Sequence, residues 1–190
     1  MAATLLNGLQ GKSASMALII PSVTPIFLSH LELLQQAQHF QKKLAKIGIS
    51  PKEAVAIAFP NTIEFAIAFL ATTFQRAISA PLNSAYKQEE FEFYLEDLKA
   101  SILLLPKGAV AQNGEAVRAA RQCGTAIGEI YWDELEVVLE IVESGDLKKR
   151  GPAKVETPVE DDVALILHTS GTTGRPKAVR KLLKLEMKSS

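Results

Sequence analysis

Several residue types that mark common protein classes are scarce in this 190-residue sequence. Its single cysteine, Cys123, cannot form an internal disulfide, which fits a reducing compartment. We expect Cys123 to act as a small buried hydrophobic residue and not as a nucleophile. The 21 basic and 21 acidic residues give a net charge of zero, so no overall field attracts nucleic acid or an anionic membrane. A nucleic-acid partner is therefore not expected.

Metal-binding and membrane-spanning patterns are also missing. His30 and His39 have no cysteine or carboxylate at ligand spacing, so we expect surface or packing roles for them and no metal site. The apolar run at 16–20 is too short to cross a membrane and is followed by Pro21. Residues 1–28 lack the early charge and the cleavage site of a secretory leader. We expect a cytoplasmic protein with no membrane span.

What the sequence does contain is a repeated alternation of apolar strands and helical patterns. Strands are predicted at 54–59, 77–82, 101–105, 125–131 and 163–167, with helical periodicity between them. The hydrophobic content of 47% is ample for a buried core. This alternation is typical of an α/β fold with a mostly parallel sheet flanked by helices.

Helix boundaries are marked by local signals. Ser29 and Glu32 form a capping box at the start of the first long helix, and Gly48 ends it. An Asn61 and Glu64 pair is expected to open the second helix. A later helix is predicted over 132–142, followed by an exposed linker over 143–158.

Hydroxyl side chains, glycines and a lysine are concentrated in residues 168–177, whose sequence is HTSGTTGRPK. The hydroxyl side chains donate hydrogen bonds, the two glycines let backbone N–H groups approach an anion, and Lys177 adds a compact positive charge. Arg175 and Pro176 separate Gly174 from Lys177, which excludes a Walker A loop, and the spacing also excludes a Rossmann fingerprint. By composition alone, the run could equally be a turn that only reverses the chain.

The order of residues in this run resembles the ATP-binding signature of the adenylate-forming superfamily, the acyl-CoA and aryl-CoA synthetases and their relatives. Segments 59–65, 80–86 and 89–95 are also similar to the amino-terminal half of that family's large domain. The likeness covers about residues 17–178 and is greatest to the oxalate–CoA ligases. It implies that the fold is part of the amino-terminal domain of an adenylate-forming enzyme, opened by a small hairpin over 17–28.

The resemblance implies a reaction in two steps. A carboxylic acid, possibly oxalate, reacts with ATP to give an acyl-adenylate and pyrophosphate, and coenzyme A then displaces AMP. ATP, Mg²⁺ and coenzyme A are the implied cofactors. His168 is expected to frame the site. The residues implied to hold the ATP phosphates are Thr169, Ser170, Gly171, Thr172, Thr173, Gly174 and Lys177.

The family's remaining functional residues are implied to lie beyond the matched part, so no catalytic and no metal-binding residue is assigned in this chain. We divide the chain into a variable segment 1–16, a partial AMP-binding domain 17–178 and a divergent tail 179–190. The tail departs from the family at Ala178, where a glycine is usual. It fits either a changed reading frame or gene end, or a short basic helix for a membrane surface or partner. It ends in Lys-Ser-Ser and carries no peroxisomal signal, although full-length relatives can be peroxisomal.

We therefore expect an acid–CoA ligase by descent that is truncated after its phosphate loop and inactive alone. One alternative is a noncatalytic interaction or regulatory fragment that associates with a full-length relative. A further alternative is an independent nucleotide-binding module.

Overall fold

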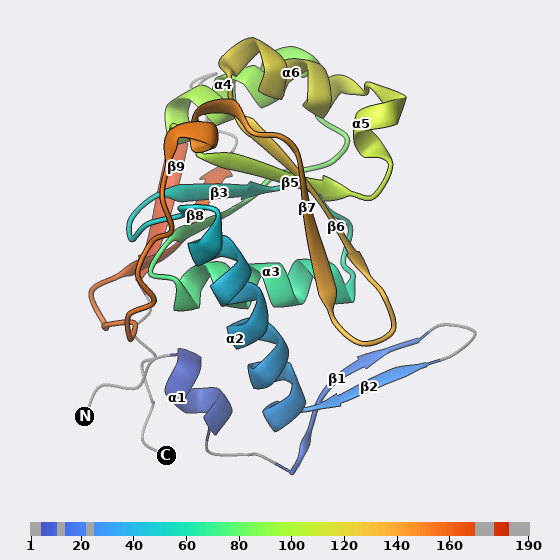
Figure 1. The fold of residues 1–190 in the computed structure, drawn as a ribbon, viewed down its shortest axis with the longest axis vertical. Helices are drawn as coiled ribbons and strands as arrows, with labels where there is room; N and C mark the ends of the chain where they lie inside the picture. The colour runs from blue at the N-terminus through green and yellow to red at the C-terminus, as the bar shows by residue number, and fades with distance from the viewer. Residues whose placement is uncertain (1–4, 11–13, 22–24, 170–176, 183–190) are drawn as a thin grey trace.

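The computed structural model describes residues 5–10, 14–21, 25–169 and 177–182 (Figure 1). The strands are β1 Met16–Ile20, β2 Ile26–Ser29, β3 Ala54–Ile57, β4 Ile78–Pro81, β5 Ile102–Pro106, β6 Ala126–Trp132, β7 Val137–Glu143, β8 Val163–Thr169 and β9 Lys177–Leu182. The α-helices are α1 Leu5–Gln10, α2 His30–Lys46, α3 Ile63–Phe74, α4 Gln88–Leu98, α5 Ala109–Gln112 and α6 Glu115–Cys123, and a 3₁₀ helix covers Gly145–Lys149. None of the helices within these ranges is long and apolar enough to cross a membrane.

A seven-stranded sheet forms the centre of the molecule, in the order β7-β6-β5-β3-β4-β8-β9 (Figure 1). β3 pairs in parallel with β4 and β5, β5 with β6, and β4 with β8. β7 and β9 run antiparallel to their neighbours at the two edges. The predicted α/β fold with a mostly parallel sheet is confirmed. Because the five inner strands point the same way, the loops that follow them lie along one edge of the sheet.

Helices cover both faces of this sheet (Figure 1). Side chains alternate between the faces along each strand. Val55 and Ile57 of β3 therefore pack with α2 and α3, whereas Ala56 packs with α4 and α6. All four residues of β3 are buried. The result is a three-layer arrangement with a core on each side of the sheet.

The first long helix begins and ends as its sequence signals predict. The Ser29 hydroxyl accepts a hydrogen bond from the Glu32 backbone N–H, and the Glu32 carboxylate accepts one from the Ser29 N–H. After the helix, Gly48 has a φ of +90°. A Cβ at this position would come within 2.9 Å of both Arg150 and Gly151, so glycine is required here.

The predicted start of the second helix is wrong. The N-cap of α3 is Thr62, not Asn61, and the Thr62 hydroxyl accepts from the Phe65 N–H at 3.5 Å. Glu64 does not close a capping box. Its carboxylate accepts a hydrogen bond from the backbone N–H of Trp132 at 3.0 Å, so a long-range contact replaces the local one.

The helix predicted over 132–142 is also wrong, because this segment forms a hairpin with β6. Asp133 accepts hydrogen bonds from the backbone N–H groups of Leu135 and Glu136 at 3.0 and 2.8 Å, which closes a turn. These backbone donors lower the pKa of Asp133. The residues that follow are rich in β-branched side chains and pair with β6 from Trp132 to Ile127.

The segment predicted as an exposed linker, 143–158, is packed against the domain in part. Leu147 within the 3₁₀ helix is buried, and the Ala153 N–H donates to the Ala45 carbonyl at 2.8 Å. The segment therefore has a fixed path from β7 to β8.

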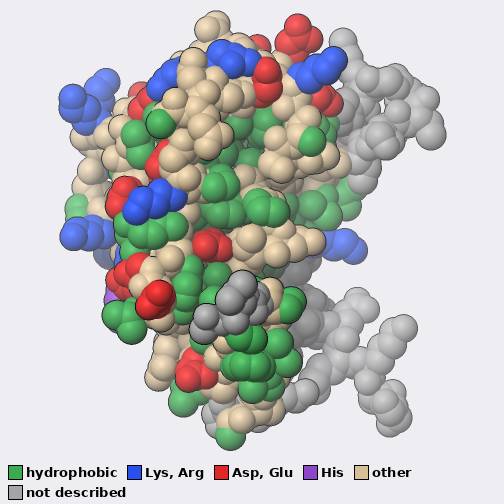
Figure 2. All heavy atoms as spheres, turned by 90° about the vertical axis from the view of Figure 1, so that its right-hand side faces the viewer, with side chains coloured by type: hydrophobic (Ala, Val, Ile, Leu, Met, Phe, Trp, Pro, Cys, Tyr) green, Lys and Arg blue, Asp and Glu red, His purple; other side chains and the backbone are tan. Residues whose placement is uncertain are grey.

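The expected opening hairpin is present as the antiparallel pair β1 and β2. Met16, Ile19 and Phe27 on this hairpin are 53%, 58% and 54% exposed. Figure 2 shows hydrophobic side chains gathered over the hairpin, on the lower part of the face that is turned to the viewer.

We predict that Gly145→Ala destabilises the fold while Gly151→Ala does not. Gly145 has a φ of +45°, and a Cβ there would come within 2.7 Å of the Gly124 carbonyl oxygen and 2.8 Å of the Ala126 nitrogen. The left-handed backbone alone costs a non-glycine residue about 1–2 kcal/mol. A Cβ on Gly151 meets no atom within 4 Å, which makes it the matched control. Urea denaturation of both variants measures the difference, and equal midpoints would contradict this account.

Candidate functional site

The candidate phosphate loop connects β8 to β9 at the edge of the sheet where the parallel strands end. β8 pairs with β4 at Ser79 and Leu165, and with β9 from Val163 to Thr169. Thr169 and Lys177 are direct partners in the antiparallel register. The two ends of the loop are therefore held side by side.

The residues predicted to contact phosphate are only partly within the described structure. Ser170, Gly171, Thr172, Thr173 and Gly174 lie outside the described residues. For Thr169 and Lys177, the backbone is described as the end of β8 and the start of β9. The assignment of these seven residues to the ATP phosphates stays a prediction. Residues 177–182 form a strand, so the basic helix considered for the tail does not begin there.

His168 lies directly before this junction and contacts α4. Its side chain is only 3% exposed. Nε2 lies 2.9 Å from a carboxylate oxygen of Asp97, and the imidazole ring lies 4.6 Å from the Tyr94 ring, centroid to centroid. Tyr94 packs in turn against Tyr86, with ring centroids 5.0 Å apart. The position of His168 beside the loop follows from the sequence, whereas its partners do not. The one available signal is the i, i+3 spacing of Tyr94 and Asp97, which puts both on one helix face.

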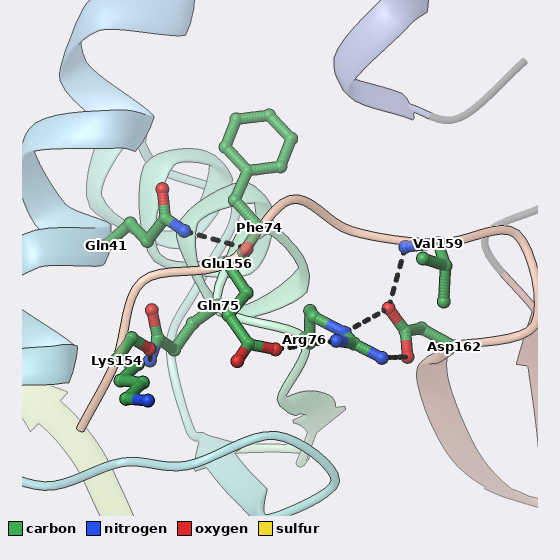
Figure 3. Close-up of polar contacts among 8 residues, drawn as sticks. All are labelled: Gln41, Phe74, Gln75, Arg76, Lys154, Glu156, Val159 and Asp162. Carbon is green, nitrogen blue, oxygen red and sulfur yellow. Dashed lines mark hydrogen bonds and ion pairs between the residues drawn. The ribbon is translucent and has the colours of Figure 1, made fainter.

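A buried ion pair holds the other end of β8 (Figure 3). Arg76, directly after the turn that ends α3, donates from Nε and Nη2 to the two carboxylate oxygens of Asp162 at 2.9 and 3.2 Å. Asp162 is the residue before β8, and its side chain is 4% exposed. The carboxylate also accepts from the Val159 N–H at 2.9 Å. The hydrogen bond to Asp162 raises the pKa of Arg76, and Glu156 adds a second, more exposed partner.

The same region is tied to α2 and α3 by two buried amides (Figure 3). The Gln75 side-chain amide donates to the carbonyls of Ile49 and Lys154, each at 2.9 Å. Gln41 donates to the Phe74 carbonyl at 2.8 Å. Such bonds satisfy backbone carbonyls that would otherwise be buried without partners. The chain that leads into β8 is thus fixed before the candidate loop begins.

A cavity of about 340 Å³ opens at the same edge of the sheet, between the ends of β3 and β5. The connection after β3 goes to the α3 face and the connection after β5 goes to the α6 face, so this is a topological switch point, where open α/β sheets bind ligands. Pro60, Ser84, Pro106 and Glu115 are among its lining residues. It is separated from the candidate loop in the sheet by β4.

The other titratable candidates have structural roles. His39 pairs with Glu136 at 3.0 Å on the surface, and His30 contacts Ser15. Cys123 is half-buried and thus less buried than expected. Burial raises the pKa of its thiol, and the negative charges of the nearby Glu96 and Glu92 raise it further. Within the described ranges, no three potential metal-ligating side chains cluster.

Comparison with known proteins identifies the family. The family model described as AMP-binding enzyme matches residues 13–180. The chain belongs to the AMP-binding enzyme family. An oxalate–CoA ligase of Arabidopsis thaliana is 40% identical over 164 residues, which are 86% of this chain and 31% of that protein. An oxalate–CoA ligase of Saccharomyces cerevisiae is 37% identical over 191 aligned residues, covering 88% of this chain and 35% of that protein. The chain thus spans about a third of the length of the curated relatives it matches.

Solved structures support the fold assignment. ATP-bound MatB from Rhodopseudomonas palustris superposes with a TM-score of 0.71 at 23% identity, over 96% of this chain and 35% of that one. The N-terminal domain of FACL13 from Mycobacterium tuberculosis gives a TM-score of 0.70 at 22% identity, over 96% of this chain and 45% of that one. At these identities the likeness concerns the fold alone. The expected family and its amino-terminal α/β architecture are confirmed.

We predict that Asp162→Ala lowers the free energy of unfolding by about 1–3 kcal/mol, because it removes the acceptor shared by the Arg76 guanidinium and the Val159 N–H. Glu156→Ala is the matched control, because it removes a carboxylate from the same guanidinium but on the exposed side. Its expected effect is below about 1 kcal/mol. Chemical denaturation measures both variants, and an equal loss of stability in the two would refute a special role for Asp162.

A second prediction concerns Tyr94. Burial, with a contribution from Tyr86, raises the pKa of its hydroxyl from 10.0 to about 12. The folded state therefore keeps this proton when the unfolded state has lost it, so stability falls as the pH rises from 10 to 12. Hydrogen bonding to Glu140 also raises the pKa of Tyr131, so spectrophotometric titration of the three tyrosines should show two that ionise late. Tyr94→Phe should remove the later of the two. A wild-type titration with no late tyrosine would contradict this.

Proposed function

We propose that this chain carries the phosphate-binding part of an ATP-dependent acid–CoA ligase. The observation that supports this most directly is the HTSGTTGRPK run, which spans the β8–β9 junction at the carboxyl edge of a parallel sheet, in a chain of the AMP-binding enzyme family. In this proposal, the β- and γ-phosphates of ATP are bound by Thr169, Ser170, Gly171, Thr172, Thr173, Gly174 and Lys177.

Three physical features of the run suit this task. Closely spaced hydroxyls and backbone N–H groups can surround phosphate oxygens, and glycines allow the close approach. Lys177 adds a point charge that offsets the negative charge of the leaving pyrophosphate. The register pairs the Lys177 backbone with Thr169, so the lysine begins its strand at the base of the loop.

The proposed overall reaction is the AMP-forming ligation of a carboxylic acid to coenzyme A. The carboxylate attacks the α-phosphate of ATP, pyrophosphate leaves, and the thiol of coenzyme A then displaces AMP. Mg²⁺ would accompany ATP and neutralise phosphate charge. We propose oxalate as the first acid to test, because two similar proteins are named oxalate–CoA ligases.

We further propose that the 190 residues do not complete this reaction by themselves. They align with only about a third of the similar ligases. A phosphate loop alone is expected to bind MgATP with a dissociation constant of about 1 mM, or about 4 kcal/mol. The proposed unit for this binding is residues 17–178, flanked by a variable segment 1–16 and a divergent tail 179–190. A cytoplasmic location is part of the same proposal.

The test is MgATP binding by the 190-residue chain and by two lysine variants. We expect Lys177→Ala to weaken binding about tenfold, because it removes the charge at the loop. Lys181→Ala is the control, since Lys181 lies on the same strand opposite Leu165, away from the loop. Titration followed by nuclear magnetic resonance gives both dissociation constants. Equal affinities for the wild type and Lys177→Ala, or no binding by the wild type, would reject the proposal.

A noncatalytic role is the second candidate, and one surface feature favours it. Leu167 and Val179 are register partners on the β8–β9 hairpin and are 40% and 39% exposed. This apolar pair could pack against an intact ligase. Adding the chain to a full-length oxalate–CoA ligase and measuring the rate separates the two roles, because a phosphate-binding fragment without such contacts leaves the rate unchanged.

A further inference from the structure

We propose that His168 is a positioning residue, which holds the base of the phosphate loop against α4 through Asp97 and Tyr94. This inference rests on the proposed function for the part that concerns ATP. It assigns to three side chains a role that the loop sequence alone does not reveal.

Backbone pairing with the inner strand β4 does not extend to the loop end of β8. The register between β8 and β4 pairs Leu165 with Ser79, and β4 ends two residues later at Pro81. Beyond Leu165, the described backbone pairs of β8 are with β9, the last strand of the sheet. Side-chain contacts at His168 therefore add to the hold that β9 gives on this end of β8.

His168 supplies such a contact at the position nearest the loop. A carboxylate only accepts hydrogen bonds, so Nε2 of His168 carries the proton and donates to Asp97 at 2.9 Å. The tautomer and the ring orientation are thereby fixed together. The His168 side chain is 3% exposed and that of Asp97 is 48% exposed, so the imidazole is enclosed while its acceptor remains in contact with water.

The Tyr94 ring restricts the imidazole from a second direction. The two rings lie 4.6 Å apart with an interplanar angle of 47°. Tyr94 is itself buried and packs against Tyr86, which in turn packs edge-on against Phe91 at 5.9 Å. The imidazole is therefore held on a rigid aromatic cluster of α4 and the loop before it.

The expected consequence is a preorganised junction. His168 fixes the chain one residue before Thr169, whose backbone faces Lys177. Without this contact, Thr169 is held less firmly beside Lys177, and anion binding must then offset the cost of ordering that junction. Loss of the contact should thus weaken phosphate binding without removing any group that touches phosphate.

The first measurement is spectroscopic and needs no nucleotide. The sequence has three histidines, so their imidazole resonances can be assigned by single substitutions. We expect His168 to show the Nε2–H tautomer in the wild type and to lose this preference in Asp97→Ala. A mixed tautomer in the wild type would overturn the inference.

The second measurement is the affinity for MgATP and for magnesium pyrophosphate. His168→Gln and Asp97→Ala should each raise both dissociation constants about tenfold, and Asp97→Asn, which keeps an acceptor oxygen, should restore part of the affinity. His39→Gln is the matched control, because His39 also donates from Nε2 to a carboxylate, that of Glu136, but on the surface near β7. The His39→Gln variant should bind MgATP and magnesium pyrophosphate with the same affinities as the wild type.

The outcomes separate the two proposals. If the wild type binds neither probe, the proposed function fails and the positioning role fails with it. If the wild type binds and Asp97→Ala binds equally well, only the positioning role is overturned. Denaturation curves ensure that affinities are compared for folded protein, so a variant that is merely less stable but binds normally also counts against the inference.

Discussion

The pairing of β3 on both of its edges is the constraint on which the rest of this structure depends. All four residues of β3 are buried, with parallel partners β4 and β5 on either side. Because parallel strands need crossover connections, each neighbour requires a covering helix, and those helices form the two outer layers. The same constraint brings the ends of five strands to one edge, where both the cavity and the candidate loop lie.

Side-chain hydrogen bonds hold β8 at both of its ends, in addition to its pairing with β4 and β9. Arg76 holds the entrance through Asp162, and His168 holds the exit through Asp97. The backbone of Arg76 is left-handed, with a φ of 60°, which is uncommon for a residue other than glycine. The candidate loop thus follows a strand whose two ends are fixed by side chains from α4 and from the turn after α3.

The sequence predicted the features that depend on local chemistry. The capping box at Ser29, the glycine at position 48 and the inner strands all follow from residues close to one another in the chain. The errors arise where distant residues compete. Glu64 has a suitable spacing for a helix cap, but its carboxylate accepts a hydrogen bond from the distant Trp132 N–H. Residues 137–143, which are rich in β-branched side chains, pair with β6 and do not continue the predicted helix. Neither Asp97 nor Asp162 carried a motif, since their partners lie 71 and 86 residues away.

The charge of the outer strand β9 affects which other strands can pair with its free edge. Its six residues, KAVRKL, include three cationic side chains and no acidic one. An edge strand offers unpaired backbone groups to any extended segment, and charge is one means by which proteins restrict that pairing. Two copies of β9 placed edge to edge would bring like charges together, whereas an acidic strand would meet complementary charge. The charge on β9 therefore opposes pairing of this edge with a second copy of itself.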